Sequence, residues 1–177
     1  MDKVDFCRSM AKYCNPYSDY YYPIRRSFGQ TLNTCPMDAV IAYANISTTK
    51  NPVIQNKEFL VAGLCYNVAH TTTYDKDDVK YVKIEQLLHR LVMKDETRKK
   101  EISKLLQLTY DNNGYFSKVF YTLCKKLIPL LHPNEQIDYI SLLNDLIYWD
   151  NGVQVKMRWA MATVFNEKEE NNDKEGN

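Results

Sequence analysis

The chain has 177 residues and a formal net charge of +1, with 45% hydrophobic and 25% charged residues. This length suits one domain or two small packed lobes, and the apolar content is sufficient for a real core. No apolar run reaches the roughly 18 residues of a membrane span, and 5 Gly and 6 Pro are few for a chain made of strands and turns, so we expect neither a membrane protein nor an all-β fold.

The N-terminal segment reads MDKVDFCRSMAKYC and lacks the continuous apolar stretch of a secretory signal peptide. The 5 cysteines are odd in number, widely spaced and never arranged as C-x-x-C, which indicates neither a disulfide framework nor a zinc site. Together these features predict a cytoplasmic protein with reduced, buried thiols.

Two helices and a tyrosine-rich segment are predicted in the first part of the chain. The segment YSDYYYPI, residues 17–24, precedes a pair of arginines, and its tyrosines suit either stacking on nucleobases or packing between lobes. A short helix is predicted from about Asp38 to Ile46, and a longer one from Lys57 to His70. The polar, aperiodic stretch from Thr71 to Val82 predicts a linker.

After this stretch, apolar residues recur at the three- and four-residue spacing of amphipathic helices, with breaks at residues 111–114, 132–134 and 150–152. The pattern predicts four or five helices. In the last of them we expect one stripe to face the core, formed by Val153, Met157, Ala160, Met161 and Val164. The predicted fold class is all-α and two-lobed, with a small N-terminal helical lobe (1–74) and a C-terminal helical bundle (75–166).

The final residues, 167–177, hold 5 acidic and 2 basic side chains and are predicted to form a disordered acidic tail. Without them the chain has 21 basic and 17 acidic residues, a net charge of +4. This excess is modest for a nucleic-acid-binding protein, so any basic surface must be local.

Motifs for catalysis are missing from the sequence. The 3 histidines are far apart, no H-E-x-x-H occurs, and neither G-x-G-x-x-G nor a P-loop is present. Asp145 and Asp150 are better explained by helix capping and solvation than by acid–base chemistry. We therefore predict a protein that is not an enzyme and has no cofactor; an enzyme would require a pocket around His89, Asp145 or Cys124.

Basic residues gather at four places: Arg25–Arg26, Lys99–Lys100 with Lys104, Lys118 with Lys125–Lys126, and Lys156 with Arg158. Lys99 and Lys100 lie near a predicted helix start, where cations oppose the macrodipole, and a phosphate partner would explain them. The alternative is a solvated face with local ion pairs. Trp149 and Trp159 are expected to anchor the core, the alternative being stacking platforms for bases.

The order of several motifs resembles a known family. PIRRSFG is followed by RKKEISKLLQLT, then LLNDLIYWD and finally VKMRWA, over a span from Ile24 to Phe165. This series resembles the small-subunit family of the type I-E CRISPR Cascade complex. The resemblance implies a non-catalytic, two-lobed all-α subunit of an antiviral ribonucleoprotein, present in two copies beside the other Cascade subunits.

In such a complex the expected partners are guide RNA, the target DNA strand and the displaced non-target strand, while base pairing supplies the sequence choice. By motif position the resemblance marks five phosphate-binding residues: Arg25, Arg26, Lys99, Lys100 and Arg158. Lys104, Lys126 and Lys156 are added because they lie close to these in the sequence. The alternative function is a helical protein–protein adaptor without a nucleic-acid role.

Overall fold

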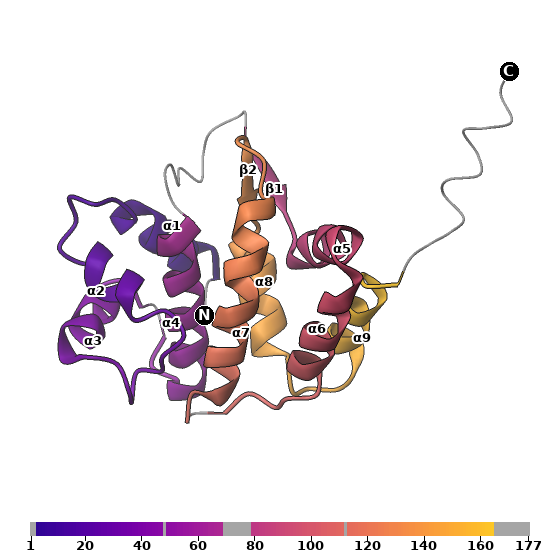
Figure 1. Cartoon of the computed structure of the whole chain (residues 1–177). Helices are drawn as coiled ribbons and strands as arrows, with labels where there is room; N and C mark the ends of the chain where they lie inside the picture. Colours follow the sequence, from indigo (N-terminus) through magenta and orange to yellow (C-terminus); the bar gives the residue numbers. More distant parts are fainter. Residues whose placement is uncertain (1–2, 48, 69–78, 112, 165–177) are drawn as a thin grey trace, which may run out of the picture.

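The computed structural model describes residues 3–47, 49–68, 79–111 and 113–164 (Figure 1). Of the described residues, 65% are helical and 4% are in strands, which confirms the all-α prediction. The predicted tail, 167–177, lies outside the described residues, as does most of the predicted linker. Within the described part of the chain, no helix combines the length and the apolar character needed to cross a membrane.

The N-terminal helices are α1 (Lys3–Tyr13), α2 (Tyr21–Arg26), α3 (Met37–Ala44) and α4 (Pro52–Val68). The central helix is α4, in which every residue from Asn56 to Tyr66 is buried. It begins five residues before the predicted start at Lys57. Proline is well tolerated in the first helical turn, where its missing N–H has no intrahelical partner anyway, so Pro52 starts the helix rather than ending a loop.

The remaining elements are β1 (Lys80–Val82), α5 (Ile84–Lys94), a 3-10 turn (Glu96–Arg98), α6 (Lys99–Leu106), α7 (Tyr115–Leu127), a second 3-10 turn (Ile128–Leu130), β2 (Glu135–Ile137), α8 (Tyr139–Ile147) and α9 (Gln154–Met161). In Figure 1, α7 stands between the N-terminal helices on one side and α6 on the other. Gly114 has φ +89°, a left-handed conformation that lets the chain turn into α7.

The strands are a correction to the predicted linker, which extended to Val82. The segments Lys80–Val82 and Glu135–Ile137 pair in parallel, with Val82 opposite Ile137. Three residues are too few to show an alternating sequence pattern, so the pairing was not visible in the sequence. Both Val82 and Ile137 are fully buried and extend the core between α5 and α8.

One hydrophobic core runs through N-terminal and C-terminal helices alike, because α8 packs against both α1 and α4. The division into lobes at residue 74 remains a prediction. Trp149 and Trp159 are both fully buried, and their ring centroids lie 5.1 Å apart in an edge-to-face arrangement. The prediction that the tryptophans anchor the core is confirmed.

The predicted core face of α9 was wrong. Val153, Met157, Met161 and Val164 are all more than half exposed, whereas Val155 and Trp159 are buried. Trp159 determines the orientation, since the indole is the largest apolar group on the helix and its Nε1 donates a hydrogen bond to the buried Asp145 carboxylate at 2.9 Å. The methionine stripe is consequently left on the surface.

Candidate nucleic-acid interface

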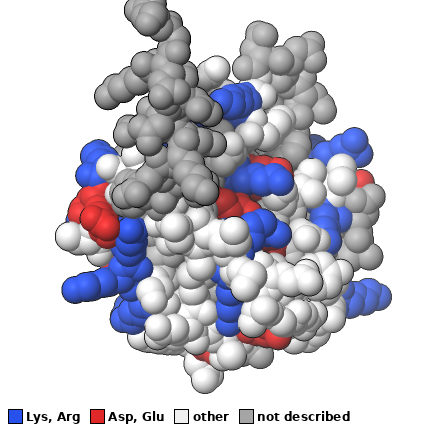
Figure 2. Space-filling model, turned by 90° about the vertical axis from the view of Figure 1, so that its right-hand side faces the viewer, with Lys and Arg blue, Asp and Glu red and all other residues white. Residues whose placement is uncertain are grey.

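The eight predicted phosphate-binding residues lie on four helices and do not form one patch. Arg25 and Arg26 end α2; Lys99, Lys100 and Lys104 are on α6; Lys126 is on α7; Lys156 and Arg158 are on α9. Figure 2 looks at the side that carries α5, α6 and α9, and there the blue Lys and Arg side chains are separated by white and red ones. The intramolecular contacts of each residue therefore decide which can meet a ligand.

Arg158 and Lys156 hold α9 against the core. The Arg158 guanidinium pairs with both Glu85 and Asp145, and Asp145 is only 4% exposed. Hydrogen bonds from Arg158 to Asp145 raise the pKa of the guanidinium further, so the charge is permanent. Lys156 donates to the backbone carbonyl of Leu108 at 2.8 Å, and its Nζ lies 5.4 Å from the Trp149 ring centroid. Both side chains therefore stabilise the packing of α9 against the rest of the protein.

Three further predicted residues form ion pairs near the surface. Arg26 pairs with Asp38, and Lys126 pairs with Glu101. Lys99 pairs with Glu96 at 2.9 Å within the same helical turn. Pairs of this exposure contribute only about 0–1 kcal/mol, so a phosphate can exchange with the carboxylate at little cost.

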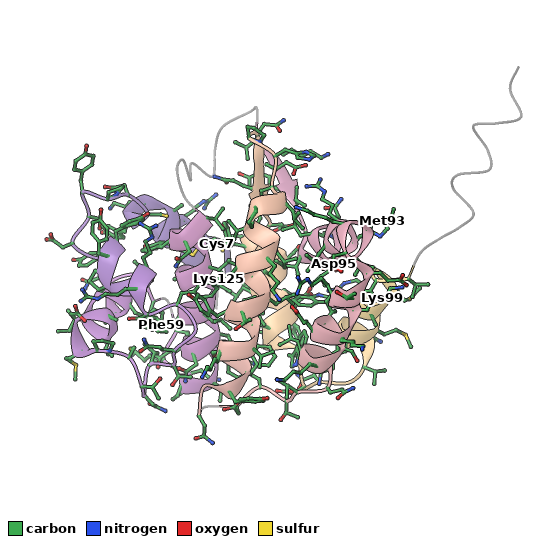
Figure 3. All side chains as sticks on the ribbon, viewed as in Figure 1. Cys7, Phe59, Met93, Asp95, Lys99 and Lys125 are labelled. Carbon is green, nitrogen blue, oxygen red and sulfur yellow. The ribbon has the colours of Figure 1, made fainter. Side chains whose placement is uncertain are left out.

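The other three predicted residues, Arg25, Lys100 and Lys104, form no ion pair with a carboxylate of the described residues. Two more cations of this kind were seen in the sequence but not assigned to the site, namely Lys118 and Lys125 on α7. Their spacing of seven residues was the available signal, because it places both on one face of a helix. Both are exposed, and in Figure 3 Lys125 lies on the side of α7 toward the N-terminal helices.

We call the exposed surface of α7 and its two flanks the α7 face. Its ridge carries Tyr115, Lys118, Thr122 and Lys125 at steps of three and four residues. Because Lys125 is in the last turn of α7, its charge is favourable to the helix dipole as well as available to a ligand. A pocket lies on each side of this ridge, so the α7 face is continuous from α6 to α2.

On one side is the α6–α7 groove, a cavity of about 400 Å³ that includes Lys104, Tyr115, Lys118 and Lys126. The Lys104 Nζ lies 5.7 Å from the Tyr115 ring centroid. Glu101 also lines the groove, where it pairs with Lys126. The groove offers cations beside an exposed aromatic ring, the combination that tracks a nucleic-acid backbone and stacks its bases.

On the other side is the α2–α7 pocket, a cavity of about 460 Å³ lined by Tyr22, Arg25, Arg26, Phe28, Asn67 and Tyr121. The guanidinium carbon of Arg25 lies 5.7 Å from the Tyr21 ring centroid, and the Lys125 Nζ lies 5.3 Å from that of Tyr121. Each cation is thus held beside an aromatic ring without a competing negative charge among the described residues.

The tyrosine-rich segment packs against other N-terminal residues, and base stacking by it stays a prediction. Tyr21 is buried and stacks on Tyr66 with ring centroids 5.6 Å apart, and Tyr20 packs edge-to-face on Tyr13 at 5.0 Å. Tyr22, in contrast, is 53% exposed and lines the α2–α7 pocket. Tyr20 and Tyr21 are thus used for packing, and Tyr22 lies at the candidate interface.

Residues considered for catalysis lie in separate surroundings. Cys124 is fully buried, which raises the pKa of its thiol well above the ordinary value. Asp145 is engaged by Arg158 and Trp159, and the His89 ring nitrogen Nδ1 lies 3.1 Å from the Ala162 carbonyl. Over the described ranges, no three His, Cys, Asp or Glu side chains are grouped to hold a metal ion.

Comparison with known proteins gives no relative. No family model, no curated protein and no solved structure matches this chain.

Proposed function

We propose that this protein binds the sugar-phosphate backbone of single-stranded nucleic acid through the α7 face, as a non-catalytic subunit of a larger assembly. The observation that carries the proposal is the set of cations on this face that pair with no described carboxylate, placed beside exposed tyrosines. These cations are Arg25, Lys104, Lys118 and Lys125.

Whether a cation can bind phosphate depends on whether it already neutralises a buried carboxylate. A lysine or arginine that already pairs with a buried carboxylate, as Arg158 does, is not available to phosphate. Exposed cations without a partner release counterions from the nucleic acid when they bind, and this release drives sequence-independent affinity. Tyrosine rings add stacking on bases of any type, which favours a single strand.

The resemblance in sequence motifs supports a narrower form of the proposal. We propose that the chain acts as a small subunit of a type I-E CRISPR Cascade complex, in the cytoplasm. Its partners would be guide RNA, the target and non-target DNA strands, other Cascade subunits and a second copy of itself. Arg25 belongs both to the residues marked by the resemblance and to the α7 face.

An adaptor role is favoured by one observation, the exposed stripe on α9. Val153, Met157, Met161 and Val164 present an apolar strip on the surface, and methionine-rich strips adapt to protein partners. A protein contact on α9 is compatible with a nucleic-acid contact on α7, because the two surfaces use different residues. A subunit of a ribonucleoprotein needs both kinds of contact.

The test is affinity purification of the full chain from its own cells, with and without nuclease treatment. The proposal predicts co-purification of a short RNA and several proteins, and loss of the RNA when Lys118 and Lys125 are both changed to Glu. Recovery of one protein partner without nucleic acid, unchanged by nuclease or by these substitutions, would support the adaptor and contradict the proposal.

A further inference from the structure

The α2–α7 pocket is closely packed on its inner side, where two glycines leave room for aromatic rings. Gly29 has φ +91°, and a Cβ at this position would lie 2.8 Å from Cβ of Tyr121. A Cβ on Gly63 would lie 2.9 Å from the Phe28 ring. Any residue other than glycine at positions 29 and 63 would therefore push Tyr121 and Phe28 away from the backbone. The two rings lie with their centroids 5.0 Å apart and their planes at 90°.

A polar group is fixed at the rim of this pocket. The Asn67 side-chain amide donates both of its hydrogens, to the Arg25 carbonyl at 2.9 Å and to the Gly63 carbonyl at 2.8 Å. These two bonds set the orientation of the amide and leave its Oδ1 as an acceptor. The pocket thus combines a fixed acceptor, the guanidinium donors of Arg25, and the rings of Tyr22 and Tyr121.

We propose that the α2–α7 pocket accepts one unpaired nucleobase, with its phosphate held by Arg25 or Lys125. The volume of about 460 Å³ falls within the range of roughly 300–1,000 Å³ found for small-ligand sites. A planar heteroaromatic ring matches the tyrosine faces, and the hydrogen-bonding edge of each of the common bases carries a donor and an acceptor for Asn67 and Arg25.

The alternative ligand of this chemistry is a bare phosphate chain, which would use the two arginines and ignore the rings. The ring arrangement favours the base, since Tyr22 is kept 53% exposed beside the pocket although its neighbour Tyr21 is buried. Base edges in a duplex are already paired, so the pocket selects single strands. This inference rests on the proposed function and specifies what the α7 face recognises besides charge.

The experiment compares two ligands with equal numbers of phosphates, a 12-nucleotide oligothymidylate and the same chain made wholly of abasic sites. Binding of the full-length protein is measured by fluorescence anisotropy. We expect the base-containing strand to bind at least about 5-fold more tightly, the lower end of what stacking of one base contributes. Tyr22→Leu and Tyr121→Leu should each reduce this ratio and leave the affinity for the abasic chain unchanged.

Tyr17→Leu is the matched control, because Tyr17 belongs to the same tyrosine-rich segment but is 98% exposed and lines neither pocket. It should keep the ratio of the parent. Equal binding of both ligands by the parent, or an unchanged ratio in both pocket variants, would overturn the nucleobase site while leaving backbone binding intact. If neither ligand binds, the proposed function fails as well.

Discussion

Arg158 and Lys118 are both basic residues on helices, yet only one of them has a charge to offer a ligand. Arg158 neutralises Asp145 inside the protein, whereas Lys118 lies in the α6–α7 groove without a described carboxylate partner. A carboxylate as buried as Asp145 must be paired, since an isolated buried charge is costly. At the scale of single residues, a cation that pairs with a buried carboxylate stabilises the fold, whereas an exposed cation without such a partner is available to a ligand.

This distinction predicts different outcomes for two substitutions. Arg158→Met should lower the free energy of unfolding by about 3 kcal/mol, because it leaves Asp145 buried without a cation. Lys100→Met, at an exposed position without an ion pair, should change it by less than about 0.5 kcal/mol. Urea unfolding measures both. A neutral effect of Arg158→Met, together with weakened strand binding, would instead make Arg158 a ligand contact.

Glu135 provides a second prediction, based on pH. Its carboxylate receives hydrogen bonds from both terminal nitrogens of Arg90, at 2.5 and 2.8 Å, and from the backbone N–H of His132 at 3.1 Å. The bonds from Arg90 are the main cause that lowers the pKa of Glu135 from 4.5 to about 2. A lowered pKa in the folded protein stabilises it above pH 4.5, and that stabilisation is lost as the pH falls toward 2.

Glu135→Gln should therefore be less stable than the parent at pH 7, and the difference should shrink as the pH falls below 4.5. Thermal unfolding followed by circular dichroism between pH 7 and pH 3.5 measures this. The same difference at every pH would mean that the Arg90 contact does not lower the pKa of Glu135.

At the scale of elements, the helices were predictable because their apolar spacing is long and regular. The orientation of α9 was not predictable, because apolar residues lie on two faces of this helix. Only the tertiary contacts of Trp159 determine which face is buried. The strand pair was hidden by its length of three residues. The ends of the helices depended on local chemistry, as at Pro52, which starts α4 instead of preceding it.

Substituting two glycines tests whether the turn after α2 packs tightly against α7. Gly29 and Gly152 both have positive φ, +91° and +103°, but only Gly29 lies against Tyr121. Alanine at either position should cost about 1–2 kcal/mol for the left-handed backbone, and Gly29→Ala should cost more because its Cβ would collide with Tyr121. Guanidinium unfolding compares them. Equal losses would show that α7 moves away freely, and the base pocket would then not be rigid.

At the scale of the whole molecule, the sequence predicted which residue types would form the interface, but not which of them remain available. Lys99, Lys126 and Arg26 were reasonable candidates, yet each pairs with a carboxylate in the structure. Arg26–Asp38 and Lys126–Glu101 join residues 12 and 25 positions apart, and such pairs are not visible in a local motif. Lys118 and Lys125 gain importance only because α7 lies between two pockets.

The net charge of +1 is consistent with a binding surface confined to one face, since charge far from the α7 face contributes little at physiological salt. A control for that surface is available in the fold. Lys12 and Lys94 each lie in the last turn of a helix, α1 and α5, as Lys125 lies in the last turn of α7. Reversing both charges changes the net charge as much as reversing Lys118 and Lys125 does, without touching the α7 face.

The most direct measurement is the salt dependence of binding to a 20-nucleotide single strand by three proteins: the parent, Lys118→Glu/Lys125→Glu and Lys12→Glu/Lys94→Glu. With about four phosphates neutralised, the parent should show a log–log slope of roughly −3, and loss of two contacts should make the slope shallower by about 1.4. The control should retain the parent's slope. Equal slopes for the two double variants would contradict binding through the α7 face.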